Sequence, residues 1–307
     1  MPLKRTKLRN AASEKKGIVF SVDEEAPLMA FLIAKLPNKS RNNIKSLLRN
    51  KQVLVDQIII SQFDHPLQVG QKVEISAGKN RIEKRFAEFT IVYEDESLIV
   101  IDKAAGLLSM ATKNEKRLTA FSMLSDYVKR ADEHGKIFIV HRLDRDTSGL
   151  MVFAKNEEVK RSLQEGWNQS GVEKTYVAFV EGKLDKPEGT IISYLSEDKV
   201  FKVHSSQNPK KGVKAVTHFS VIESNGVFSL LNVKIETGRK NQIRVHMEDI
   251  GHSIVGDRKY GASSSPIRRL GLHAQKLGFT HPASGEKLHF ETKIPPAFQL
   301  LINRKHR

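Results

Sequence analysis

The sequence predicts an α+β fold in two parts: a small α/β domain, then a larger domain built on a mixed, largely antiparallel sheet. Strand-like and helix-like segments alternate from residue 89 onward, and several strands are joined by short turns, which favours hairpins over a doubly wound parallel sheet. Charge changes at the same place. Residues 1–86 carry 17 basic and 8 acidic side chains, whereas residues 87–307 carry 34 and 27.

Composition excludes several classes of protein. The chain has no cysteine, which excludes a disulfide framework, a thiolate nucleophile and a zinc site built on cysteine. No apolar run approaches the roughly 20 residues that would span a bilayer, and residues 1–17 lack the apolar core of a secretory signal. We therefore expect a cytoplasmic protein without a membrane partner. The net charge of +16 indicates a polyanionic partner, most commonly nucleic acid.

The amino-terminal part begins with a basic segment. Residues 1–17 hold six basic groups and one acid and are expected to form a flexible arm. Residues 26–36 form an apolar helix candidate that ends at Pro37. Ser40 is an expected N-cap for a second helix that runs to about Asn50. Strands are expected at 53–55, 58–60 and 72–75.

The expected second helix carries a row of cations. Arg41, Lys45 and Arg49 recur every fourth residue, which aligns them on one face, and Lys51 follows. No acid interrupts this helix, so the cations repel one another unless a polyanion neutralises them. A solvated helix face is the alternative.

Two helices, the second of them basic, followed by a short hairpin make residues 18–80 similar to an S-four RNA-binding domain. Asp56-Gln57 stands where that domain usually has an Asn-Gly turn. The resemblance implies that Arg41, Lys45, Arg49 and Lys51 bind RNA. The polar residues 81–88 are the expected linker to the larger domain.

The larger domain is expected to begin with strands at 89–93 and 98–101 and a helix at 118–130. Short strands at 137–140 and 150–154 follow, and Asn156 is an expected cap for the next helix. Further strands are expected at 174–180 and 228–235, and a helix at 240–250 that ends at Gly251.

The most informative segment is His141 to Gly149, nine residues between two apolar strands, of which seven are polar or charged. So long a charged connection between buried strands is typical of a functional loop, although such charges are often only solvated. His141, Asp144 and Ser148 could form a hydrolase triad, but their spacing lacks a nucleophile elbow. No facing pair of metal ligands accompanies them, so no metal site is expected.

A second informative segment is Thr237 to Met247. Ile243 and Met247 belong to the buried stripe of the expected helix, and Arg244 lies at its border. There Arg244 can either reach a carboxylate from a half-buried position or pair with Glu248 one turn later. The helical pattern leaves both options open.

Residues 89–307 resemble the RluA-type pseudouridine synthases. The motifs that carry this resemblance are 141–149 (HRLDRDTSG), 174–176 (KTY), 238–246 (GRKNQIRVH), 251–261 (GHSIVGDRKYG), and 272–274 with 279–282 (LHA and FTHP). Two stretches depart from the family pattern. Residues 103–106 read Lys-Ala-Ala-Gly where Lys-Pro-x-Gly is common, and Lys240-Asn241 stands where Thr-His is frequent.

The resemblance implies a catalytic core with a central cleft that isomerises uridine to pseudouridine in RNA. It makes Asp144, Tyr176 and Arg244 the expected catalytic residues: Asp144 acts at the sugar, Arg244 keeps it ionised and oriented, and Tyr176 stacks on the base. Asp144 could stabilise or trap charge at the anomeric carbon, or could remove the proton of the neighbouring ribose carbon.

The resemblance further implies that Arg142 fills the space left by the flipped uridine, with His141 and Ile243 as substrate-binding residues. No outside atom enters the reaction, so no cofactor is expected. Ribosomal RNA is the expected partner and the protein an expected monomer. Transfer RNA as substrate, or an RNA-binding ribosome-assembly factor without activity, remain the alternatives.

Overall fold

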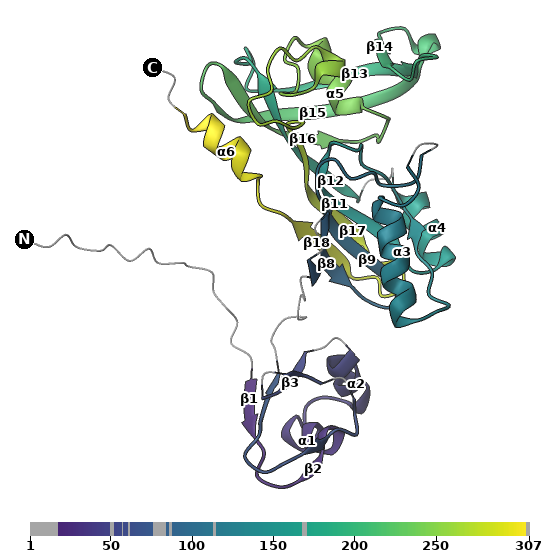
Figure 1. The fold of residues 1–307 in the computed structure, drawn as a ribbon, viewed down its shortest axis with the longest axis vertical. Helices are drawn as coiled ribbons and strands as arrows, with labels where there is room; N and C mark the ends of the chain where they lie inside the picture. Colours follow the sequence, from purple (N-terminus) through teal and green to yellow (C-terminus); the bar gives the residue numbers. More distant parts are fainter. Residues whose placement is uncertain are drawn as a thin grey trace, which may run out of the picture. The chain divides into compact units, whose positions relative to one another are not determined.

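The computed structural model describes residues 18–49, 52–56, 58–60, 62–75, 84–85, 88–112, 115–167 and 171–304. The chain divides into two compact units, residues 1–82 and 83–307 (Figure 1). In the described residues no helix is both long and apolar enough to cross a membrane. The expected basic arm, Lys51 and Gln57 lie outside the described residues.

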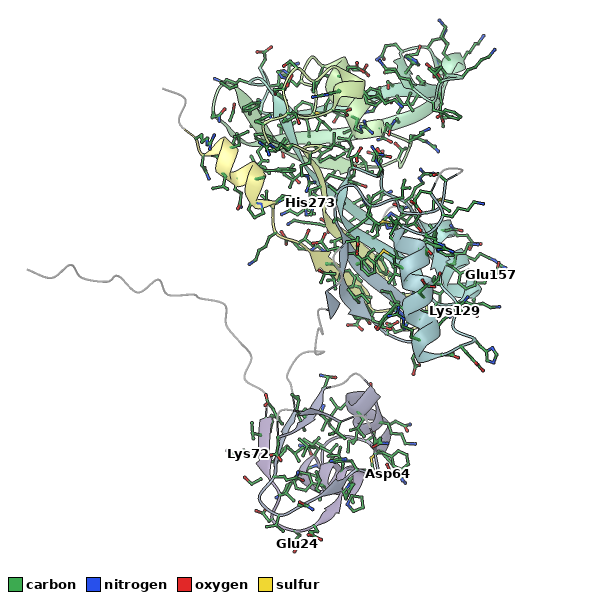
Figure 2. The ribbon with its side chains drawn as sticks, viewed as in Figure 1. Glu24, Asp64, Lys72, Lys129, Glu157 and His273 are labelled. Carbon is green, nitrogen blue, oxygen red and sulfur yellow. The ribbon has the colours of Figure 1, made fainter. Side chains whose placement is uncertain are left out.

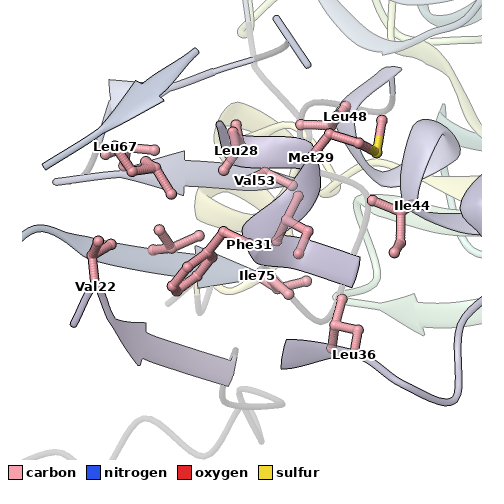
Figure 3. Packing of buried hydrophobic residues seen from close by; sticks show 13 residues of the cluster. Val22, Leu28, Met29, Phe31, Leu36, Ile44, Leu48, Val53, Leu67 and Ile75 are labelled. Atoms are coloured by element: carbon pink, nitrogen blue, oxygen red, sulfur yellow. The ribbon is translucent and has the colours of Figure 1, made fainter. Parts of the chain in front are cut away.

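The first unit is a small sheet covered by two helices. Its four strands run in the order β1 (Ile18–Ser21), β6 (Lys72–Ile75), β3 (Val53–Val55) and β4 (Ile58–Ile59), and β2 (Ala26–Pro27) pairs separately with β5 (Pro66–Leu67). Helices α1 (Leu28–Lys35) and α2 (Arg41–Arg49) pack on this sheet. Figure 3 shows the shared core, in which Leu28 and Phe31 of α1 meet Ile44 of α2 and Val53 of β3.

Local sequence signals locate the ends of both helices. The Ser40 hydroxyl accepts a hydrogen bond from the Asn43 amide at 3.2 Å, which makes Ser40 the predicted cap of α2. Helix α1 begins at Leu28 rather than at the predicted residue 26, because Ala26 and Pro27 pair with β5. Asp56 has the left-handed φ of 47°, a conformation that aspartate and asparagine tolerate better than most residues.

The second unit is built on one large sheet of twelve strands. Its main path is β14, β13, β15, β16, β12, β17, β11, β9, β8 and β7, while β10 pairs with β11 and β18 with β17. The bounds are β7 (Lys84–Arg85), β8 (Phe89–Glu94), β9 (Leu98–Lys103), β10 (Phe138–Ile139), β11 (Ser148–Ala154), β12 (Glu173–Glu181), β13 (Glu188–Glu197), β14 (Val203–Ser206), β15 (Val213–Ser224), β16 (Phe228–Ile235), β17 (Leu272–Thr280) and β18 (Lys287–Glu291). Among the described strands of this sheet, β11 and β17 are the one parallel pair, so the predicted mixed, mostly antiparallel α+β fold is confirmed.

One stretch of this sheet lies within the expected linker. Residues 84–85 form β7 and pair with β8, so part of segment 81–88 belongs to the sheet rather than to a free connection.

Helices cover both faces of each half of the sheet. Alternate residues of β9 point to opposite faces: Ile99 and Ile101 pack with α3 (Ala120–Ala131), whereas Leu98 and Val100 pack with α4 (Glu157–Gly166). In the other half, α5 (Gln242–Asp249) and α6 (Pro296–Ile302) bury opposite faces of β12 and β16 (Figure 1). Two 3₁₀ turns, Pro209–Lys211 and Arg258–Tyr260, complete the unit.

Helix α4 has its expected cap, and helices α3 and α5 begin within two residues of their predicted starts. Asn156 accepts a hydrogen bond from the Val159 amide at 2.8 Å and caps α4 as predicted. Thr119 caps α3, one residue after the predicted start of that helix. Helix α5 starts two residues later than predicted, because Asn241 takes a left-handed φ of 54°.

The two halves of the sheet meet where β11 runs parallel to β17. Gly149 lies beside Ala274 at this point, and Figure 2 labels the neighbouring His273. A Cβ on Gly149 would come within 2.2 Å of the Ala274 carbonyl oxygen, and Gly149 has a φ of 115°. The residue that ends the charged loop is therefore fixed as glycine by contact and by backbone conformation.

We expect Gly149→Ala to lower the free energy of unfolding by at least about 3 kcal/mol, from positive-φ strain and overpacking together. Gly106 is the matched control: its φ is 94°, but a Cβ there meets nothing within 4 Å. Gly106→Ala should therefore cost only about 1–2 kcal/mol. Urea unfolding of the two variants measures the difference, and equal losses would contradict the close contact at Gly149.

Candidate active site

A small cavity of about 70 Å³ brings together five of the residues singled out in the sequence. They are Arg142, Asp144, Tyr176, Ile243 and Arg244. They come from three elements: the loop before β11, strand β12 and helix α5. Residues that the family resemblance grouped together, although they lie up to about 100 positions apart in the sequence, thus line the same cavity.

A larger cavity of about 230 Å³ adjoins the small one. Arg142, Tyr176, Ile235 and Gly238 line both. His141 lines only the larger cavity. Arg142 is exposed and Tyr176 half-buried, so both can meet a molecule that enters.

Arg244 links two carboxylates. Its Nε and Nη2 donate to Asp257 Oδ2 and Oδ1 at 2.6 and 2.7 Å, a bidentate pair in which the Asp257 side chain is only 1% exposed. Its Nη1 donates to Asp144 Oδ2 at 3.4 Å. Arg244 therefore reaches a carboxylate from a half-buried position, and the alternative partner Glu248 contacts Lys202 instead.

The surroundings of Arg244 keep it charged and fixed. Burial alone would disfavour the cation, but the hydrogen bonds and charge of Asp257, with Asp144, raise the pKa of Arg244 above its ordinary value. The guanidinium lies over the Tyr260 ring at 4.9 Å, and Nη1 also donates to Asn241 Oδ1 at 3.2 Å. A cation held on so many sides presents one fixed N–H to Asp144.

The loop that carries Asp144 is held through its backbone. The buried Lys103 ammonium donates to the Arg145 carbonyl at 3.0 Å, to Leu107 at 2.7 Å and to Ala104 at 3.0 Å. Burial lowers the pKa of Lys103 to about 8, although nearby carboxylates oppose this. The Ser109 hydroxyl bonds to both the carbonyl and the amide of Leu143. These bonds fix the residues on each side of Asp144 without using its side chain.

Tyr176 lies at an irregularity between β12 and β17. Thr175 pairs with Lys276, but Tyr176 pairs with Ala274, so Gln275 is bulged out of the register. Bulges beside functional sites often re-aim a side chain. Burial, together with the Asp144 charge, raises the pKa of Tyr176, so its hydroxyl stays protonated at neutral pH.

His141 is a neutral acceptor. Its Nε2 accepts from the Val152 amide at 3.1 Å, and its ring stacks on Trp167 with the centroids 4.3 Å apart. Burial, and then the Lys174 charge, lower the pKa of His141 to about 3. His141 therefore lacks the role that a hydrolase triad requires, because Ser148 pairs instead with His273 at 2.7 Å.

The predicted RNA-binding cations lie in the first unit. Arg41 and Lys45 are exposed on α2, and Arg49 ends that helix, its side chain being outside the described set. In the described part of the chain, no group of three or more histidine and acidic side chains is arranged to hold a metal ion.

Sequence reasoning assigned no role to three residues that organise the site: Asp257, Lys103 and Ser109. Asp257 lies in the motif at 251–261, and Lys103 is the first residue of the stretch 103–106. Their positions in these segments were the sequence signal that could have identified them. Their partners are 13, 42 and 34 residues away in the chain, beyond any helical or strand period.

Comparison with known proteins gives a consistent result. Residues 97–249 match the family described as RNA pseudouridylate synthase, a range that contains Asp144, Tyr176 and Arg244. The chain is 33% identical over 248 residues to the RNA pseudouridine synthase YhcT of Bacillus subtilis, covering 80% of each chain. It is 32% identical to the ribosomal large subunit pseudouridine synthase D of Nitrosomonas europaea, covering 87% of this chain and 80% of that one. Among solved structures, human RNA pseudouridylate synthase domain containing 4 superposes with a TM-score of 0.58 at 25% identity, covering 68% of this chain and 90% of that one.

The buried pair between Arg244 and Asp257 yields a stability prediction. Asp257→Asn removes the main countercharge of a cation whose side chain is 13% exposed, and should lower the free energy of unfolding by about 3–5 kcal/mol. The control is Glu291→Gln, which breaks the more exposed 3.2 Å pair with Lys276 and should cost less than about 1 kcal/mol. If urea unfolding gives similar losses for both variants, Asp257 does not hold Arg244 in the way described.

Proposed function

The chain belongs to the RNA pseudouridylate synthase family, and we propose that it isomerises specific uridines of large-subunit ribosomal RNA to pseudouridine. Two relatives that support this choice of substrate are named ribosomal large subunit pseudouridine synthase D, from Nitrosomonas europaea and Salmonella typhimurium. The observation that carries the proposal is the pairing of Asp144 with a fixed arginine at a cavity wall.

The reaction breaks the bond between the ribose anomeric carbon and N1 of uracil and joins that carbon to C5. The proton on C5 is lost and N1 gains one, so no atom is added overall. The Asp144 carboxylate acts at the ribose, either by stabilising or trapping positive charge at the anomeric carbon or by removing the proton of the adjacent carbon. Both routes require an ionised carboxylate.

Arg244 is the positioning residue for that carboxylate. Because Asp257 occupies Nε and Nη2, a single N–H faces Asp144, and the 3.4 Å distance leaves the carboxylate loosely held. A single hydrogen bond orients the group without occupying both oxygens. One oxygen thus remains available to the sugar.

Tyr176 and Arg142 act on the flipped nucleotide. Tyr176, which lines both cavities, stacks on the uracil, and its protonated hydroxyl can donate near the end of the reaction. Arg142, exposed at the same walls, fills the gap that the base leaves in the RNA and offsets part of the few kcal/mol that flipping costs. His141 and Ile243 complete the substrate-binding walls.

The first unit is an S-four-like domain that binds the RNA outside the reaction site. Its second helix exposes Arg41 and Lys45 along the border of the face that buries Ile44 and Leu48, and Arg49 and Lys51 extend the row in sequence. Such cations contact phosphates without reading bases.

Asp144→Asn should reduce pseudouridine formation in a ribosomal RNA transcript by at least about a thousandfold, because the amide carries no charge to act at the sugar. Asp146→Asn is the control, since Asp146 lies two residues further along the same loop and pairs with the exposed Arg145. Mass spectrometry of the RNA measures both. Undiminished activity of Asp144→Asn would remove the proposed role, and restoration of a cellular defect by the inactive variant would favour an assembly factor.

Replacing Arg41 and Lys45 with alanine should weaken binding to the same transcript and reduce its salt slope by about one to two, because fewer counterions are released. The double variant Lys129→Ala/Arg130→Ala removes the same charge from the exposed end of α3. It should change neither quantity by a comparable amount. Equal effects of the two variants in binding assays at 50 and 200 mM salt would mean that only net charge matters.

A further inference from the structure

The hairpin between β13 and β14 ends in an exposed aromatic ring in a strained backbone. Phe201 is 68% exposed and has a φ of 60°. This left-handed conformation favours glycine and is energetically unfavourable for residues that have a Cβ. The Phe201 amide closes a turn onto the Asp198 carbonyl at 3.0 Å, and Asp198 Oδ1 accepts from the Val200 and Lys202 amides. These hydrogen bonds make the turn rigid. Phe201, with its large ring, occupies the position in the turn whose backbone conformation favours glycine.

Three lysines lie over Phe201, at its carbonyl or in its turn. The Lys240 ammonium lies over the Phe201 ring, 5.3 Å from its centroid, and also pairs with Glu197. The Lys259 ammonium donates to the Phe201 carbonyl at 2.7 Å. Lys199 is exposed within the same turn. An exposed aromatic among lysines matches the chemistry of single-stranded nucleic acid, whose bases stack and whose phosphates attract ammonium groups.

The ring is tied to the wall of the small cavity. Lys240 lies between Arg239 and Asn241, which both line that cavity. The Tyr260 hydroxyl accepts from the Val203 amide at 3.1 Å and from the Asn241 amide group at 2.9 Å, and Arg244 lies over the Tyr260 ring. The hairpin is thus fastened to the residues that hold Arg244.

We propose that Phe201 is a stacking platform for an unpaired base of the substrate RNA close to the target uridine, with Lys240 and Lys259 beside the adjoining phosphates. The proposal rests on the proposed function in taking RNA as the substrate. It also accounts for Lys240, which departs from the family pattern and contacts the ring. A rigid turn that holds the ring in place before binding lowers the entropy cost of the contact.

The test uses full-length protein and an in vitro transcript of large-subunit ribosomal RNA. Phe201→Gly should weaken binding of the transcript, measured in the Asp144→Asn background, and raise KM in the active enzyme by about tenfold, with kcat within about twofold. The salt slope should stay the same because the ring carries no charge, whereas Lys240→Gln should reduce the slope. Phe201→Tyr should behave as the unsubstituted protein.

A stability control separates loss of the ring from loss of structure. Glycine fits a φ of 60°, so Phe201→Gly should unfold at the same or higher urea concentration while it binds RNA more weakly. Val200→Ser is the matched surface control, because Val200 is 77% exposed in the same turn, and it should leave affinity and KM unchanged.

Each outcome has a defined meaning. Unchanged affinity and KM in Phe201→Gly, with an active parent enzyme, would overturn the platform and leave the proposed function intact. The same result is expected if Phe201 binds a protein partner instead of RNA. A parent enzyme that forms no pseudouridine in the transcript, yet loses affinity on Phe201→Gly, would overturn the ribosomal substrate and keep the platform. Absence of both binding and activity would overturn both.

Discussion

The bidentate ion pair between Arg244 and the buried Asp257 is the interaction on which the site depends. Burying a guanidinium is costly unless its donors are satisfied, and here Asp257, Asn241 and the Tyr260 ring satisfy it from three directions. Because those partners fix the plane of the guanidinium, the remaining N–H points at Asp144 with little freedom. Arg244 therefore orients the Asp144 carboxylate but does not move with it. This arrangement suits the proposed function, in which Asp144 turns toward the substrate.

A second constraint comes from the sheet. The loop before β11 lies where the two halves of the sheet meet, and Gly149 passes too close to Ala274 for any side chain. Lys103 and Ser109 then hold the backbone on each side of Asp144 through its carbonyls and an amide, so the Asp144 side chain is not needed to fold the loop. A buried lysine that bonds only to carbonyls is expensive to desolvate, and its three acceptors offset that cost. A backbone fixed in this way holds Asp144 at the cavity wall, as the proposed function requires.

The charge of +16 divides between two different uses. In the first unit, cations repeat along a helix face and can bind phosphate without a defined geometry. In the second unit, individual cations have individual partners: Arg244 has two carboxylates, Lys103 has three carbonyls, and Lys240 has a ring and an acid. Under the proposed function, the same side-chain type serves long-range attraction in one unit and local positioning in the other, and composition alone cannot separate the two.

Features that depend on neighbours in the chain could be predicted from the sequence. The α+β class, the caps at Ser40 and Asn156 and the buried stripe of α5 follow from local hydrogen bonds and periodicity, and motif resemblance brought Asp144, Tyr176 and Arg244 together. Helix starts shifted by two residues where a strand pairing or a left-handed residue intervened. Three features could be read only from the folded chain: the carboxylate that holds Arg244, the amine that holds the loop, and the position of Phe201. Those contacts join residues 13 or more positions apart in the chain, a separation that no helical or strand period records.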